Sequence, residues 1–253
     1  MLAVTTSASA DAPLETFART LADRFKIPFV DREGKPLASL LVQAPRLLVV
    51  GKDGVTLWDE RGKLRWSPGL AALRVKRFDA GARDDMLVRW AEFQPGDEVL
   101  DCTLGIAQDA WVAARAIGPT GRVVGLEASL ALHAVVALGI ERHPRSGTMA
   151  PIQARHAEAG AFLRSLRPRA FDVVLFDPMF ERARPASGDF DTLRRFADYA
   201  PLTPAMVEQA QRVARRWVLI KASRYSKDLS KLGLRPLPGP RTATVVWARL
   251  EPR

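Results

Sequence analysis

The feature that most constrains the fold is a regular alternation of strand-like and helix-like segments from about Gly81 to the C-terminus. Short apolar runs typical of buried strands are separated by stretches with helical spacing. This alternation predicts an α/β fold with a parallel, doubly wound sheet, in which ligands bind beyond the carboxyl ends of the strands. The predicted strands are DEVLDC, GRVVGLE, MAPIQAR, FDVVLFD, WVLIKAS and TATVVWARL, and the predicted helices are AQDAWVAARAI, SLALHAVVALGIERH, EAGAFLRSL and TPAMVEQAQRVAR.

The N-terminal part of the chain has a different pattern. LETFARTLADRF predicts a helix over residues 14–25, whereas LASLLVQ, RLLVVGK and VTLWDE predict short strands separated by turn signals. We therefore expect a small α+β cap and linker over residues 13–80, followed by a ligand-binding domain over residues 81–253. Residues 1–12 lack the pattern of a secretory signal and predict a disordered tail.

Composition narrows the class of protein. Of the 253 residues, 47% are hydrophobic and 26% are charged, as in ordinary folded proteins, and no apolar run is long enough to span a bilayer. The single cysteine, Cys102, excludes an intrachain disulfide and indicates a reducing compartment, so we expect the cytoplasm. The histidines show no metal-ligand spacing with cysteine, so no metal site is predicted. The net charge of +10 favours a polyanionic partner without requiring one.

Acidic residues stand at the ends of three predicted strands. Asp101 ends the first strand before a loop with Gly105, Glu127 ends the second, and Glu158 follows the third. A carboxylate at Asp101 suits a cationic ligand such as S-adenosylmethionine, Glu127 can accept ribose hydroxyls, and Glu158 can reach an adenine amine. Each residue can instead be an ordinary helix cap or first-turn acid. A nicotinamide dehydrogenase is disfavoured, because two of the three glycines of a dinucleotide loop are missing.

The fourth strand ends in the tetrapeptide DPMF, residues 177–180. The Asp177 carboxylate and the Pro178 carbonyl can accept hydrogen bonds from an exocyclic base amine, and Phe180 can stack on that base. Because methyl transfer requires in-line placement more than acid–base catalysis, positioning by these residues should supply most of the acceleration. The same corner can hold a glutamine amide, so a protein or small-molecule substrate remains open.

In order along the chain, DCTLGIAQDA, LEAS, RHAEAG, LFDPMF and VLIKASRY resemble the motifs of the bacterial small-subunit ribosomal RNA guanine-N2 methyltransferases. The similarity extends to the cap through LADRFKIPFVDREGKPLASLLVQAPRLLVVGKDG and to RVKRFDAGARDD. The resemblance implies a Rossmann-like class I fold, the cofactor S-adenosylmethionine, and ribosomal RNA or the small ribosomal subunit as partner. The expected cofactor-binding residues, from the pattern and the resemblance together, are Asp101, Thr103, Gly105, Gln108, Asp109, Glu127, Ala128, Glu158, Ala159 and Asp177.

Several positions depart from that family's pattern. Gln108 and Ala128 stand in place of arginines, Glu158 and Ala159 in place of paired serines, and Ala107 in place of a glycine whose absence could weaken cofactor binding. The segment ERARP, which follows Phe180, replaces a run of proline and lysines. These departures leave open a catalytically weakened methyltransferase fold that binds RNA.

Two groups of residues can contact RNA phosphates and bases. One lies between cap and core and the other follows a late strand, although solvated surface charge explains both groups equally well. The predicted RNA-binding residues are Arg74, Lys76, Arg77, Arg83, Lys221, Arg224 and Tyr225. The sequence does not determine the oligomeric state.

Overall fold

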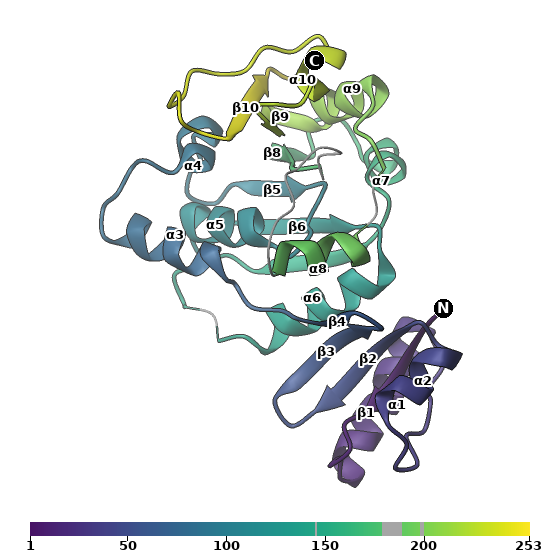
Figure 1. The fold of residues 1–253 in the computed structure, drawn as a ribbon. Helices are drawn as coiled ribbons and strands as arrows, with labels where there is room; N and C mark the ends of the chain where they lie inside the picture. Colours follow the sequence, from purple (N-terminus) through teal and green to yellow (C-terminus); the bar gives the residue numbers. More distant parts are fainter. Residues whose placement is uncertain (145, 179–188, 198–199) are drawn as a thin grey trace. The chain divides into compact units, whose positions relative to one another are not determined.

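The structure is a computed structural model that describes residues 1–144, 146–178, 189–197 and 200–253 (Figure 1). Contacts between Cα atoms divide the chain into two compact units, which we describe separately. Unit one comprises Met1–Ser67, Ser129–His143 and Ser187–Ala197, and unit two comprises Pro68–Ala128, Pro144–Ala186 and Asp198–Arg253.

Unit two contains a six-stranded sheet in the order β10-β9-β8-β5-β6-β7. The strands are β5 (Glu98–Asp101), β6 (Arg122–Glu127), β7 (Ile152–His156), β8 (Phe171–Phe176), β9 (Ala214–Ser223) and β10 (Val245–Leu250). All pairings are parallel except that of β10 with β9. The strand order reverses at β5, which has β6 on one side and β8 on the other, so the carboxyl ends of β5 and β8 flank the crevice where such sheets bind ligands.

Helices cover both faces of this sheet (Figure 1). They are α3 (Leu70–Asp79), α4 (Met86–Ala91), α5 (Gln108–Ile117), α7 (Ala159–Ser165), α9 (Pro204–Val213) and the short α10 (Asp228–Lys231). Helix α5 packs on β5 and β6 and contacts α3 and α4, and α4 also contacts β9, whereas α9 packs on β8 and β9 and contacts α7. Because side chains alternate along a strand, Leu100, Val174 and Val218 face the core shared with α7 and α9.

Unit one is built on a four-stranded sheet in the order β1-β2-β3-β4, with β1 parallel to β2 and the other pairings antiparallel. Its elements are β1 (Leu2–Thr6), α1 (Ala12–Phe25), α2 (Leu37–Gln43), β2 (Arg46–Gly51), β3 (Gly54–Asp59), β4 (Gly62–Arg65), α6 (Leu130–Arg142) and α8 (Asp189–Phe196). Helix α6 contacts β2 and β3, and Arg24 of α1 donates a hydrogen bond of 2.8 Å to the Glu141 carboxylate of α6.

Two predictions for the N-terminal region are wrong. Residues 2–6 form β1, with Ala3 and Val4 completely buried, instead of part of a disordered tail. LASLLVQ forms helix α2, because Leu37, Leu40 and Leu41 follow helical spacing and pack in one cluster. The first segment of unit one ends at Ser67, so the rest of the predicted cap and linker, residues 68–80, belongs to unit two, and unit one additionally includes α6 and α8.

None of the helices in the described ranges is long and apolar enough to cross a membrane.

Candidate active site

The parallel register of unit two gathers three carboxylates at one edge of the sheet. Asp101 of β5 pairs with Gly125 of β6 and with Leu175 of β8, so Glu127 and Asp177 each follow two residues beyond that level. Asp101 and Glu127 are buried, whereas 36% of the Asp177 side chain is exposed. The predicted convergence of these acidic strand ends is therefore present in the structure.

The loop between β5 and α5 joins the three strand ends through hydrogen bonds. The Thr103 amide donates to Asp101 Oδ1 at 3.0 Å, and the Gly105 amide donates to Glu127 Oε2 at 3.1 Å. Thr103 Oγ1 accepts a hydrogen bond of 2.6 Å from the Asp177 amide. The backbone after β8 is thus fixed to the loop that follows β5.

Two residues of this loop have left-handed backbone conformations. Gly105 has a φ of +50° and carries no Cβ, so this conformation is unstrained. Ala107, which precedes α5, has a φ of +62°, and its Cβ makes this conformation unfavourable by about 1–2 kcal/mol. Ala107 is completely buried, so its methyl group points into the protein. Whether this methyl group weakens cofactor binding or the loop tolerates it stays a prediction.

Asp101 has the environment expected of a ligand for a cation. Burial, together with the charges of Asp109 and Asp177, raises the pKa of its carboxyl to about 7 against the opposing hydrogen bond from Thr103 and the charge of Lys221. An ammonium or sulfonium group beside Asp101 would favour the ionised carboxylate and offset the free energy that burial of its charge costs. The carboxylate set at the sheet edge therefore fits S-adenosylmethionine, which carries both cations.

A chain of alternating charges extends from Asp177 toward helix α4. Lys221 Nζ of β9 lies 2.7 Å from Asp177 Oδ2 and 3.0 Å from Asp109 Oδ2. Arg74 of α3 contacts Asp109 at 2.6 Å and Asp85 at 2.7 Å. The Asp85 carboxylate also accepts hydrogen bonds from the first amides of α4. This ionic chain, Asp177–Lys221–Asp109–Arg74–Asp85, was not predicted, since sequence spacing gives no signal for contacts between α3, α5 and β9.

The ionic chain keeps its central members charged despite burial. Burial disfavours the Lys221 ammonium, but the Asp109 and Asp177 carboxylates outweigh it and raise the pKa of Lys221. Burial likewise opposes the charge of Asp109, yet Lys221 and Arg74 hold the pKa of Asp109 below its usual value. For Asp177, burial and the charge of Asp109 prevail over Lys221 and raise the pKa of the carboxyl.

The ionic chain also corrects two of the predicted RNA contacts. Only 26% of the Arg74 side chain and 21% of the Lys221 side chain are exposed, and both cations are already paired with carboxylates. They are internal members of the site instead of surface cations that bind phosphate. The other five residues remain predicted RNA contacts: Lys76, Arg77, Arg83, Arg224 and Tyr225 are all exposed.

The remaining predicted cofactor contacts have local structural roles. Both oxygens of Glu158 accept hydrogen bonds from the Gly160 and Ala161 amides at 2.7 and 2.6 Å, so Glu158 caps α7. Ala159 is buried in the first turn of that helix. The Ala128 carbonyl accepts a hydrogen bond of 3.0 Å from His156 Nε2. An adenine contact by Glu158 and cofactor contacts by Ala128 and Ala159 stay predictions.

The predicted substrate corner is described in part. Asp177 and Pro178 are half-buried at the end of β8, and Pro178 has no amide hydrogen to compete for the carboxylate. Phe180 and ERARP lie outside the described residues.

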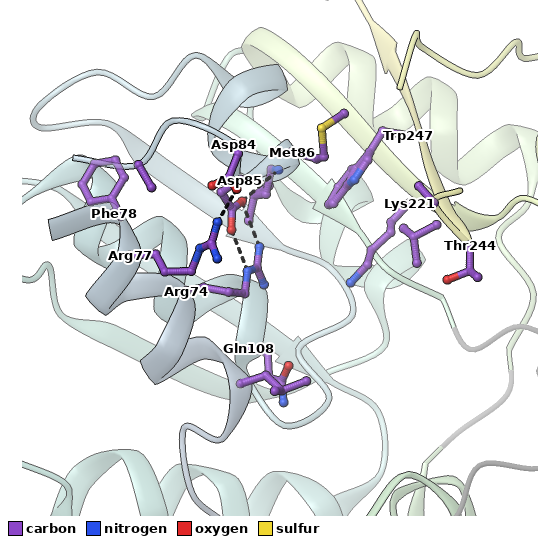
Figure 2. Close-up of a pocket in the computed structure, with 15 residues that line it drawn as sticks. Arg74, Arg77, Phe78, Asp84, Asp85, Met86, Gln108, Lys221, Thr244 and Trp247 are labelled. Carbon is purple, nitrogen blue, oxygen red and sulfur yellow. Dashed lines mark hydrogen bonds and ion pairs between the residues drawn. The ribbon is translucent and has the colours of Figure 1, made fainter. Parts of the chain in front are cut away.

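A cavity of about 460 Å³ opens in unit two beside the ionic chain (Figure 2). Helices α3 and α4 and the segment between them form one side, and β9, β10 and the residues before β10 form the other. Gln108, at the start of α5, also lines it. This cavity was not predicted, because its walls come from segments far apart in the chain.

A family model described as "Putative SAM-dependent methyltransferase" matches residues 47–235. The chain belongs to this family of S-adenosylmethionine-dependent methyltransferases. The predicted cofactor is thereby confirmed, and its contacts with Asp101, Gly105 and Glu127 stay predictions.

Two relatives and one solved structure are similar to this chain over most of its length. The protein YpiP of Bacillus subtilis (strain 168) is 34% identical over 223 residues, which cover 85% of this chain and 86% of YpiP. Ribosomal RNA small subunit methyltransferase J of Coxiella burnetii (strain RSA 331 / Henzerling II) is 27% identical over 230 residues, 88% of this chain and 85% of that enzyme. The crystal structure of the SAM-dependent methyltransferase NGO1261 from Neisseria gonorrhoeae superposes with a TM-score of 0.67 at 19% identity, covering 99% of this chain and 96% of that chain. This likeness confirms the predicted Rossmann-like fold.

Proposed function

We propose that this methyltransferase transfers a methyl group to the exocyclic N2 amine of a guanine in small-subunit ribosomal RNA. The observation that carries the proposal is the position of Asp177 and Pro178 at the same sheet edge as Asp101 and Glu127. The similarity to methyltransferase J of Coxiella burnetii supports ribosomal RNA as the substrate class.

The cofactor would lie along the carboxyl edge of the sheet. When bound, S-adenosylmethionine supplies an electrophilic methyl group attached to a sulfonium. Asp101 would face its cationic end, Glu127 would accept its ribose hydroxyls, and the Gly105 backbone permits close approach.

Asp177 and Pro178 would hold the acceptor amine. The lone pair of a guanine amine is delocalised into the ring, and hydrogen bonds from the amine to the Asp177 carboxylate and the Pro178 carbonyl would orient it for attack. Asp177 is fixed in advance, because its amide is bound to Thr103 and its Oδ2 to Lys221. Since burial raises the pKa of Asp177, its carboxylate is also a better acceptor for the proton released on transfer.

The surface charge of unit two is compatible with an RNA substrate. Lys76, Arg77 and Arg83 lie on or just after α3, and Arg224 and Tyr225 follow β9. Tyr225 is 72% exposed, so its ring is available to stack on an unpaired base. The partner would be ribosomal RNA or the small ribosomal subunit.

The test is methyl transfer from radiolabelled S-adenosylmethionine to small-subunit ribosomal RNA and to assembled subunits from cells that lack the gene. We expect N2-methylguanine at a defined nucleotide in the digested RNA. Asp177→Asn, which keeps the shape but removes the charge, should lower kcat by about 10²-fold or more while the demethylated product S-adenosylhomocysteine still binds.

Glu208→Gln on the exposed surface of α9 is the matched control and should leave both readings unchanged. Transfer to glutamine of a protein, or binding of the cofactor with no transfer to RNA, would contradict the proposal.

A further inference from the structure

The cavity in unit two does not coincide with the carboxylates that fit the cofactor. Among its lining residues, Lys221 alone contacts Asp177, through the 2.7 Å ion pair, and Asp101, Gly105 and Glu127 do not line it. Figure 2 shows Lys221, Thr244 and Trp247 on one side and Arg74, Arg77 and Phe78 on the other. The cavity thus adjoins Asp177 through Lys221, whereas the cofactor loop holds the Asp177 amide through Thr103 Oγ1.

The lining on the strand side suits a flat, polar ring. Trp247 is 6% exposed and contributes to the lining, and Lys221 Nζ lies over its ring, 5.7 Å from the centroid. Aromatic side chains stack on unstacked bases, and the Thr244 hydroxyl and the Gln108 amide can donate to or accept from base and sugar edges. The volume of about 460 Å³ is within the range of about 300–1,000 Å³ typical of small-ligand sites.

The lining on the helix side suits the anionic part of a nucleotide. Arg77 pairs with Asp84, but their side chains are 58% and 65% exposed, so this pair is weak and its guanidinium can exchange to a phosphate. Phe78 lies next to Arg77 in the wall, and Lys76 and Arg83 are exposed nearby in the chain.

We propose that this cavity receives the guanosine nucleotide extruded from the RNA. The base packs beside Trp247 with its amine directed to the Asp177 carboxylate, Lys221 lies beside both the base and that carboxylate, and Arg77 holds the adjoining phosphate. This inference rests on the proposed function and names the place where that function's substrate binds.

A cavity-filling substitution tests this assignment. Ala243 lines the cavity and is half-buried, so Ala243→Phe should block it without disturbing the core. We expect kcat/KM for RNA to fall at least tenfold and the Kd of S-adenosylhomocysteine, measured by calorimetry, to change less than twofold. Thr242→Phe, one residue earlier, exposed and outside the lining, is the matched control and should change neither value. Ala82→Phe fills the cavity from the helix side and should repeat the effect of Ala243→Phe.

A second measurement keeps this inference separate from the proposed function. Guanosine 5′-monophosphate is added to the protein loaded with S-adenosylhomocysteine, and binding is observed by saturation-transfer NMR. We expect binding to the wild type and to Thr242→Phe and its loss in Ala243→Phe. If the wild type methylates no RNA, the proposed function fails. The binding pattern of guanosine 5′-monophosphate still shows whether the cavity binds a nucleotide.

The inference is overturned if Ala243→Phe leaves kcat/KM and nucleotide binding unchanged. It is equally overturned if Ala243→Phe weakens S-adenosylhomocysteine binding as much as it weakens transfer, because the cavity then belongs to the cofactor. Absence of both transfer and nucleotide binding in the wild type also overturns it.

Discussion

At the scale of single residues, Lys221 is the cation that joins two carboxylates of the site. Its ammonium lies within 3.0 Å of Asp109 Oδ2 and 2.7 Å of Asp177 Oδ2. Lys221→Met keeps much of the stem but leaves two carboxylates facing each other. Removing one partner of a buried pair costs about 3–5 kcal/mol, and because Asp177 is partly exposed we expect about 2–4 kcal/mol lost from the free energy of unfolding at pH 7.

The pH dependence of that loss identifies its cause. Without Lys221 the pKa of Asp177, which is already raised, rises further, and the pKa of Asp109 rises because only Arg74 still lowers it. The variant's deficit should therefore be fully present at neutral pH and shrink as pH falls. Urea denaturation of both proteins at several pH values measures it. A deficit that is constant with pH would instead indicate lost packing. Lys231→Met, in the exposed last turn of α10, is the control substitution.

Asp101 gives a second prediction at this scale. Because burial raises the pKa of its carboxyl to about 7, the group is mostly neutral at pH 6 and mostly ionised at pH 8. The ionised form is the one that attracts the cationic cofactor, so affinity for S-adenosylmethionine should rise up to about tenfold between these pH values. Asp101→Asn should bind more weakly at pH 8 and lose this dependence. Calorimetric titrations at both pH values measure these affinities. If the affinity of Asp101→Asn changed with pH as much as that of the wild type, the prediction would be contradicted.

At the scale of elements, the β5–α5 loop carries a strained residue. Ala107 has a φ of +62°, where glycine is favoured, and its methyl group is completely buried. Ala107→Gly removes a strain of about 1–2 kcal/mol, while the unfolded chain gains entropy that offsets about 0.4–1 kcal/mol. We expect a net stabilisation of about 0.5–1 kcal/mol by urea denaturation. Ala72→Gly in helix α3, where φ is helical, should destabilise by about 0.5–1 kcal/mol, and a loss of stability in Ala107→Gly itself would contradict the strain.

The strands of unit two could be predicted from the sequence, whereas α2 and β1 could not. The six strands of unit two were predictable because each is a short apolar run between turn signals. Helix α2 was mistaken for a strand, since a seven-residue apolar run has no decisive period. Strand β1 was missed because LAVTT is stabilised by pairing with β2, more than forty residues later, and has no local signal.

The candidate site was predictable to a similar degree. The acidic strand ends were found because parallel strands bring their carboxyl ends to one edge. The ionic chain and the cavity depend on the packing of α3 and β10 against the ends of α5 and β9, which spacing along the chain does not encode.

At the scale of the whole molecule, the net charge of +10 gives a prediction about RNA binding. Each phosphate contact releases counterions, so log Kobs should fall linearly with log salt concentration. Lys76 and Arg83 are exposed, and their chain neighbours Arg77 and Ala82 line the cavity. The double variant Lys76→Gln, Arg83→Gln should reduce the magnitude of that slope by about 2. Affinity for S-adenosylhomocysteine should not change, because neither residue contacts the carboxylate set.

Arg164 and Arg167 provide the matched control for this prediction. Both are exposed, and α7, which contains Arg164, lies on the opposite face of the sheet from α3 (Figure 1). If the RNA follows the α3 side, Arg164→Gln, Arg167→Gln should leave the slope within experimental error of wild type, although it removes the same total charge. If the slope decreased equally in the two double variants, net charge alone would account for RNA binding. The assignment of the α3 surface to the RNA path would then be wrong.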